Sequence, residues 1–190
     1  MRLRFALVTL LSLGIAATTA TAGEMPEGWF SAGSHPDQYE MGSDPDVKHG
    51  GEASASLQAK SADSEGFGTL MQIADPGEYK GKRVRFSGWV KAEGVSDWAG
   101  LWFRVDGPGG RSLSFDNMQD RPIKGTGDWT HHEIVLDVPD AAIALAYGIL
   151  LSGEGHVWLD DLQFEIVAMD VPVTGKGGPP KPPQNLSFEH

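Results

Sequence analysis

The strongest constraint on the fold is an alternation of apolar and polar residues that recurs over short runs between residues 53 and 167. Period-two alternation predicts half-buried β-strands, and the 3.6-residue period of amphipathic helices is almost absent. The runs are separated by turn-forming residues, and the chain contains 25 glycines and 12 prolines. The sequence therefore predicts an all-β protein built as an antiparallel β-sandwich or a barrel.

Eight runs are candidate strands, and the turns between them carry recognisable signals. Gly107, Pro108, Gly109 and Gly110 predict a turn, and Gly-Glu-Gly at 153–155 predicts a hairpin between the last two strands. The candidate strands are residues 53–60, 67–73, 83–91, 101–106, 112–117, 129–138, 144–152 and 156–167.

The last of these runs changes its parity. Val157 and Leu159 share one face of a regular strand, whereas Leu162 and Phe164 fall on the other face. One inserted residue restores both pairs to the core, and a β-bulge supplies it. We therefore expect a bulge near residues 160–161.

The N-terminus has the parts of a secretory signal peptide. Arg2 and Arg4 precede an uncharged apolar stretch at 5–17, and Ala20-Thr21-Ala22 forms a cleavage site. A retained membrane anchor is the alternative, but the stretch is shorter than the roughly 20 residues that span a bilayer. Cleavage would leave 168 of the 190 residues, with no membrane association afterwards. The prediction is an exported protein, in the periplasm or outside the cell.

Charge and cysteine content exclude several classes of function. The formal net charge of −11 becomes −13 without the leader, which contains two arginines and no acidic residue. Such a surface repels phosphate backbones and disfavours a nucleic-acid partner. The chain has no cysteine, so disulfides, thiolate metal sites and a cysteine nucleophile are excluded.

Composition also divides the chain. Residues 1–22 are the leader, and residues 23–172 form the sandwich. Residues 173–184 are a Gly/Pro-rich linker, and residues 185–190 are a tail with alternating apolar residues.

No catalytic motif is present among the sequence patterns of serine hydrolases, zinc proteases or P-loop proteins. His131 and His132 suggest a metal, but adjacent residues on a strand point to opposite faces, so we interpret them as a surface pair. The 26 acidic residues leave a glycosidase-like carboxylate pair open without singling one out.

The candidate binding residues are aromatic and polar side chains on the non-core parity of three predicted strands, together with residues at the strand ends. Tryptophan stacks on the apolar face of a sugar ring, and charged groups bind its hydroxyls. The alternative is that a loop or the tail covers Trp89 and Trp102. The predicted ligand-binding residues are Arg85, Trp89, Trp98, Trp102, Arg104, Asp116, Asn117 and Arg121.

The order of several segments resembles a known superfamily. These segments are His49-Gly50-Gly51, residues 79–88, Asp128-Trp129 and the strand 157–162 with its Asp160-Asp161 pair. Together they resemble the carbohydrate-binding modules of the galactose-binding-like jelly-roll superfamily, particularly the cellulose- and xylan-binding types, over about residues 28–167. The resemblance implies a jelly-roll sandwich that binds carbohydrate.

Close relatives that share the run at residues 116–122 are often labelled transcriptional regulators. The leader and the negative charge of this chain fit that label poorly.

The resemblance also implies a structural calcium ion, held by a carboxylate of the last strand and the glutamate of a first-strand motif. These residues correspond here to Asp161 and Glu189. Calcium takes six to eight oxygen ligands, so stabilisation of the bulge by Asp161 is the alternative. The motif lies in the C-terminal tail, which could dock in place of a first strand, begin a second copy, or be loosely attached.

The prediction for function is an exported, non-catalytic binding module whose partner is a carbohydrate. The alternative is a sensory or interaction domain that binds an envelope protein, and a hydrolase ranks third. Because sites are grafted onto folds, the resemblance alone does not decide between them.

Overall fold

The structure is a computed structural model that describes residues 23–175. This part of the chain contains nine strands, three short 3-10 turns and no α-helix. None of its helical turns is long or apolar enough to cross a membrane. The strands are β1 (Phe30–Gly33), β2 (Tyr39–Asp44), β3 (Ser54–Ala59), β4 (Phe67–Ala74), β5 (Lys82–Gly107), β6 (Arg111–Asp116), β7 (Ile123–Val138), β8 (Ala144–Ser152) and β9 (His156–Val167).

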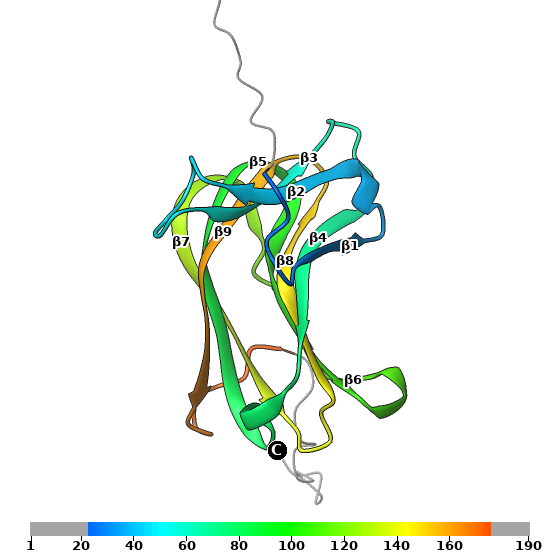
Figure 1. Cartoon of the computed structure of the whole chain (residues 1–190), viewed down its shortest axis with the longest axis vertical. Helices are drawn as coiled ribbons and strands as arrows, with labels where there is room; N and C mark the ends of the chain where they lie inside the picture. Colours follow the sequence, from blue (N-terminus) through cyan, green and yellow to red (C-terminus); the bar gives the residue numbers. More distant parts are fainter. Residues whose placement is uncertain (1–22, 176–190) are drawn as a thin grey trace, which may run out of the picture.

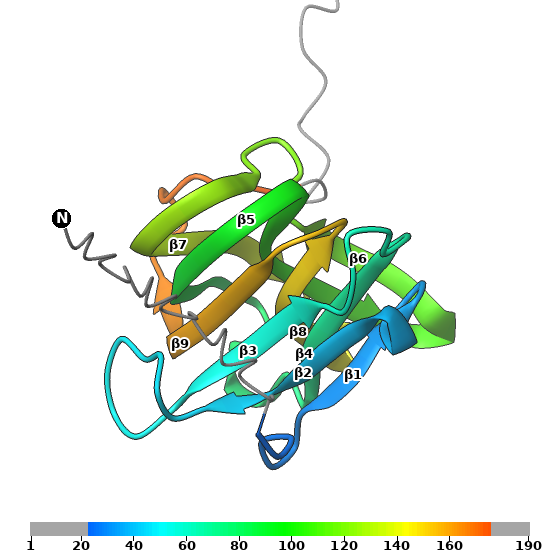
Figure 2. The ribbon, with the colours of Figure 1, turned by 90° about the horizontal axis from the view of Figure 1, so that it is seen from above.

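The 26-residue strand β5 determines the architecture because it belongs to both layers of the sandwich (Figures 1 and 2). Its first half pairs with β7 and β9, and its second half pairs with β8 and β6. Register shifts between Val90 and Ala99 mark the bend that separates the halves. The first layer has the strand order β2-β3-β9-β5-β7, and the second has the order β1-β4-β8-β5-β6.

All strand pairs are antiparallel, and the core lies between the two layers. Phe86 in the first half of β5 and Phe103 in its second half are fully buried, with ring centroids 5.9 Å apart. Phe164 of β9 packs against both rings. The predicted all-β antiparallel sandwich is therefore confirmed, and the predicted inward residues of the run 101–106 are completely buried.

Several local predictions are confirmed as well. The runs 144–152 and 156–167 coincide with β8 and β9, and residues 107–110 turn the chain between β5 and β6. The predicted bulge lies opposite Gly88, where the pairing shifts between Trp89–Asp160 and Ser87–Gln163. Asp161 adopts a positive φ of 50° within it.

Other local predictions are wrong. The turn at 153–155 is not a hairpin, because β8 pairs with β4 and β5 whereas β9 pairs with β3 and β5. This turn instead carries the chain from the second layer to the first. The runs 83–91 and 101–106 belong to one strand, and β7 begins at Ile123 rather than at residue 129. Strands β1 and β2 were not predicted.

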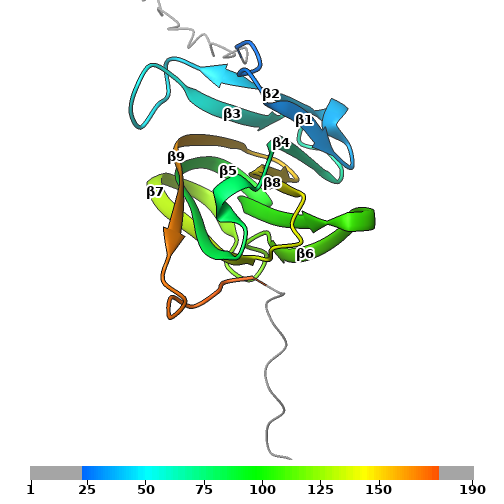
Figure 3. The same cartoon turned by 60° about the horizontal axis from the view of Figure 1, so that its bottom comes forward.

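The segment after β9 folds back across the end of the sandwich (Figure 3). The Arg83 guanidinium donates hydrogen bonds to the carbonyl oxygens of Met169 and Val171, both at 2.6 Å. The Thr174 backbone N–H donates to Val135 O, and the Val135 N–H donates to the Thr174 hydroxyl oxygen. The first residues of the predicted linker thus lie against β7. The predicted leader at 1–22, residues 176–184 and the tail at 185–190 lie outside the described residues.

Candidate functional site

The outer face of the second layer carries a groove of about 350 Å³ with aromatic walls. Residues from β1, β4, β5, β6 and β8 contribute to it, together with Asn117 directly after β6. We call it the Trp102 groove. Its larger apolar lining residues are Phe67, Met71, Trp98, Trp102, Phe115 and Leu150, and its polar side chains are Thr69, Arg104 and Asn117.

Strand register explains why these side chains meet. Directly opposed residues in antiparallel strands point to the same face. Trp102 of β5 lies opposite Gly148 of β8, which lies opposite Met71 of β4. Because Gly148 has no side chain, the Trp102 indole can cross β8, and its N–H donates a 2.7 Å hydrogen bond to the Thr69 hydroxyl oxygen.

Trp102 forms the floor of the groove rather than an open stacking platform. It is only 6% exposed and packs with Met71, Ala146 and Leu150 in a small cluster separate from the main core. Within residues 23–175, Trp102 is therefore covered by its neighbours on the sheet face and not by a long loop, so its burial has a different cause from the one considered in the sequence.

The exposed walls of the groove are phenylalanines. Phe67 and Phe115 are 39% and 38% exposed. Phe30 pairs with Met71, and Ile73 pairs with Ala146, so both extend the apolar surface beyond the groove. These four make up half of the exposed large apolar residues at positions 23–175. Exposed apolar side chains gathered on one face of a protein are a feature of binding sites.

The predicted binding residues separate into three groups. Trp98, Trp102, Arg104 and Asn117 line the groove. Arg85 and Trp89 lie on the first layer, because β5 bends between Val90 and Ala99 and its two halves face opposite sides of the sandwich. The sequence interpretation had placed all of them on one face.

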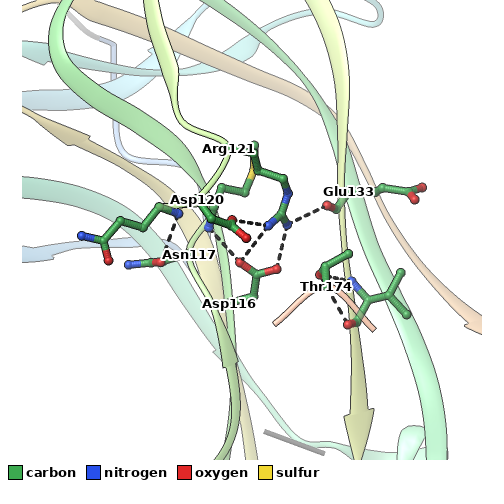
Figure 4. A network of polar contacts seen from close by, with 9 residues as sticks. Asp116, Asn117, Asp120, Arg121, Glu133 and Thr174 are labelled. Carbon is green, nitrogen blue, oxygen red and sulfur yellow. Dashed lines mark hydrogen bonds and ion pairs between the residues drawn. The ribbon is translucent and has the colours of Figure 1, made fainter. Parts of the chain in front are cut away.

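Asp116 and Arg121 form the third group, in a polar network between β6 and β7 (Figure 4). Asp116 was predicted to point outward with Phe115 inward, but β6 has the opposite parity, and Asp116 is only 6% exposed. Arg121 donates to both Asp116 carboxylate oxygens at 2.7 and 3.3 Å, and the Met118 N–H donates to one of them. Burial alone would raise the pKa of Asp116, but these partners and Thr174 hold it below the usual value.

A second cluster covers part of the first layer's outer face. The His49 ring stacks on Trp89 with centroids 4.2 Å apart, and its Nδ1 lies 2.7 Å from an Asp161 carboxylate oxygen. The backbone N–H groups of His49 and Gly50 both donate to one Asp160 oxygen. Loop 45–53 therefore covers Trp89, which is the alternative to an open binding face that the sequence analysis gave for this residue.

Asp161, one of the two predicted calcium ligands, is engaged by His49 in this structure. Glu189, the other one, lies outside the described residues. No group of three or more potential metal-ligating side chains occurs between residues 23 and 175. The calcium ion stays a prediction.

The predicted histidine pair divides between two faces. His131 is exposed and lies beside Trp89, with ring centroids 5.4 Å apart. His132 is partly buried, and burial, with smaller contributions from His131 and Arg121, lowers its pKa.

A buried polar cluster also lies on the first layer, beside a hollow of about 500 Å³. His156 Nε2 is 2.6 Å from the Ser56 hydroxyl oxygen, and the ring packs against Trp158. The Trp158 indole N–H donates to Asp44. Burial lowers the pKa of His156 to about 4, although the Asp44 charge opposes the shift.

This histidine predicts a pH-dependent stability. Because its folded-state pKa lies below the ordinary value of 6.5, the unfolded chain takes up the proton first, and stability falls as the pH drops from about 6.5 to about 4. The full shift corresponds to about 3 kcal/mol, and partial solvent exposure reduces the expected loss to about 1–2 kcal/mol. His132 acts in the same direction. When the free energy of unfolding is measured by urea denaturation at several pH values in this range, it should depend less steeply on pH for His156→Gln than for the wild type. An unchanged pH dependence would contradict the assignment.

Comparison with known proteins gives a fold but no family. No protein-family model matches the chain. The chain is 45% identical over 167 residues to a Bacillus subtilis (strain 168) protein named "Uncharacterized HTH-type transcriptional regulator YbfP". The match covers 86% of this chain and 57% of that protein, so the chain spans less than two thirds of its relative.

Two solved structures share the fold at low sequence identity. The CBM22-1 xylan-binding domain from Paenibacillus barcinonensis Xyn10C has a TM-score of 0.56 at 16% identity, covering 77% of this chain and 90% of the domain. A cyclase from Fischerella sp. TAU has a TM-score of 0.56 at 13% identity, covering 76% and 88%. The resemblance found in the sequence is thus confirmed at the level of the fold: this chain has the jelly-roll sandwich of the carbohydrate-binding modules.

Proposed function

We propose that the chain is an exported, non-catalytic binding module that binds a carbohydrate in the Trp102 groove. The aromatic walls of this groove carry the proposal. Phe67 and Phe115 offer ring faces for the apolar side of a sugar, and Arg104 and Asn117 supply polar groups at the same opening. The shared fold with a xylan-binding domain supports the same ligand class. Export rests on the N-terminal sequence.

Phe115→Ala should weaken saccharide binding about tenfold, because a stacked aromatic ring contributes about 1–2 kcal/mol. The measurement is isothermal titration calorimetry of a panel of soluble polysaccharides against the wild type and the variant. Ile143→Ala is the control, since Ile143 is also a large apolar residue, is 56% exposed against 38% for Phe115, and does not line the groove. Equal affinities of wild type and Phe115→Ala would place the ligand elsewhere.

A second candidate is a sensory domain without saccharide binding, which recognises a small effector or an envelope protein. The relative named as a transcriptional regulator favours it, because that protein is longer than the region it shares with this chain. Folded protein that binds no saccharide, yet co-purifies with one envelope protein, would favour this candidate.

Catalysis is tested in the same titrations. Chromatography of the recovered saccharides should show unchanged chain lengths for a binding module. Shortened products would replace the proposal with a hydrolase.

A further inference from the structure

The hydrogen-bonding groups of the Trp102 groove are unevenly divided between donors and acceptors. The Trp102 N–H donates to the Thr69 hydroxyl, and that hydroxyl donates to the Ile149 carbonyl oxygen at 2.8 Å. Thr69 and Trp102 therefore satisfy one another and the sheet, and they offer little to a ligand.

The polar groups left for a ligand are mainly donors. Trp98 contributes an indole N–H, Asn117 an amide NH₂ and Arg104 a guanidinium. The Asn117 side-chain oxygen already accepts the Gln119 N–H at 3.3 Å. No residue lining the groove is acidic. A sugar hydroxyl both donates and accepts, whereas a carboxylate only accepts.

Arg104 has one edge of its guanidinium free within the described chain. Its Nε and Nη2 donate to the two oxygens of Asp106 at 2.8 and 2.9 Å. Among residues 23–175, Nη1 makes no hydrogen bond or ion pair. The side chain is 41% exposed at the groove. A guanidinium has five N–H donors, and its second edge can bind a further carboxylate.

Three carboxylates close in sequence to the groove residues are occupied. Asp106 is bound to Arg104, Asp97 accepts the Ser152 hydroxyl at 2.7 Å, and Asp116 is bound to Arg121. The chain as a whole is acidic, but the Debye length is about 8 Å at physiological salt. Distant acidic residues therefore weaken a direct contact between Arg104 and an anionic ligand only slightly.

We propose that the groove selects saccharides that carry carboxylates, that is, uronic acid units, with Arg104 as the residue that determines this specificity. The inference rests on the proposed function and names the ligand class of the same site. The stacked ring lies against Phe67 or Phe115, and its carboxylate accepts hydrogen bonds from the free edge of Arg104. Asp106 holds the guanidinium in place.

The test compares three probes by calorimetry with the mature protein: polygalacturonate, its methyl-esterified form and an uncharged xylan. Esterification removes the charge and keeps the sugar backbone. The wild type should bind polygalacturonate at least tenfold more tightly than the ester. Raising the salt concentration should reduce that difference.

Two variants separate charge recognition from folding. Arg104→Gln should abolish the preference for polygalacturonate, so that polygalacturonate and its ester bind this variant with similar affinities. Asp106→Asn keeps the arginine and a side-chain oxygen that can accept from it but removes the negative charge beside the guanidinium, so it should bind polygalacturonate more tightly. Melting temperatures within a few degrees of wild type confirm that both variants are folded.

The outcomes distinguish this inference from the proposed function. Binding of xylan or the ester with no preference for polygalacturonate overturns the uronate inference and leaves the saccharide module intact. A preference that survives in Arg104→Gln overturns the role of Arg104. Folded wild-type protein that binds none of the three probes overturns the inference, and a negative result on the wider panel overturns the proposed function as well.

Discussion

Replacing Trp102 with alanine should lower the free energy of unfolding by about 3–5 kcal/mol, the range for removal of a buried aromatic side chain. The indole fills the cluster with Met71 and Leu150 and bridges β5 to β4 across Gly148. Its loss leaves a cavity on the outer face of the sheet. Urea denaturation followed by circular dichroism measures the change.

Two controls show whether the loss comes from packing. Trp102→Phe retains most of the apolar volume and should cost clearly less than the alanine variant. Trp98 lies on the same face but is only partly buried, so Trp98→Ala should lower the free energy of unfolding by about 1 kcal/mol or less. An alanine variant at 102 as stable as wild type would contradict the described burial. Since a large loss is expected, Trp102→Ala is a poor probe of ligand binding, and Phe115→Ala is the better one.

Arg121→Ala should destabilise the fold by a comparable 3–5 kcal/mol, because it leaves the buried Asp116 carboxylate without its cation. The depressed pKa of Asp116 adds a pH signature. In the wild type, the stabilising contribution of this carboxylate is present above its unfolded pKa of about 4 and is lost as the pH falls through its lower folded pKa. The variant should therefore approach wild-type stability in acid.

Arg85→Ala is the matched control for this ion pair. Arg85 pairs with Glu133 and Glu165, both largely exposed, so its loss should cost about 1 kcal/mol or less. The double change Asp116→Asn with Arg121→Gln removes both charges and should recover part of the loss. If Arg121→Ala and Arg85→Ala lower the free energy of unfolding by the same amount, the burial of the Asp116–Arg121 pair does not increase its contribution to stability.

The sequence predicted the strands with long, regular alternation because burial on one face imposes that pattern. β8 and β9 were located to the residue, and the parity change around Asp161 predicted a real bulge. β1 and β2 were missed since they are short edge strands. β1 has only four residues, and Gly42 and Asp44 interrupt the apolar period of β2.

The candidate site was only partly predictable because it depends on how β5 bends. Alternation shows which side of a strand faces the core but does not show which layer the strand belongs to. Trp89 and Trp102 each lie on the non-core side of their own alternating run, yet the bend places them on opposite faces of the molecule. Phe115 was assigned to the core because it shares its parity with Leu113 and alternates with polar residues. The Arg121 partner that allows Asp116 to be buried comes five residues later and carries no periodic signal.

The order of strands within the two layers also determines when the chain can fold. β3 pairs with β2 and β9, and β4 pairs with β1 and β8. As the chain is synthesised from its N-terminus, β1 to β4 can form only isolated two-stranded ribbons, which are marginally stable in water. Neither layer is complete until residues 144–167 have been made. Folding therefore awaits nearly the whole chain, and such long-range pairing makes it slow.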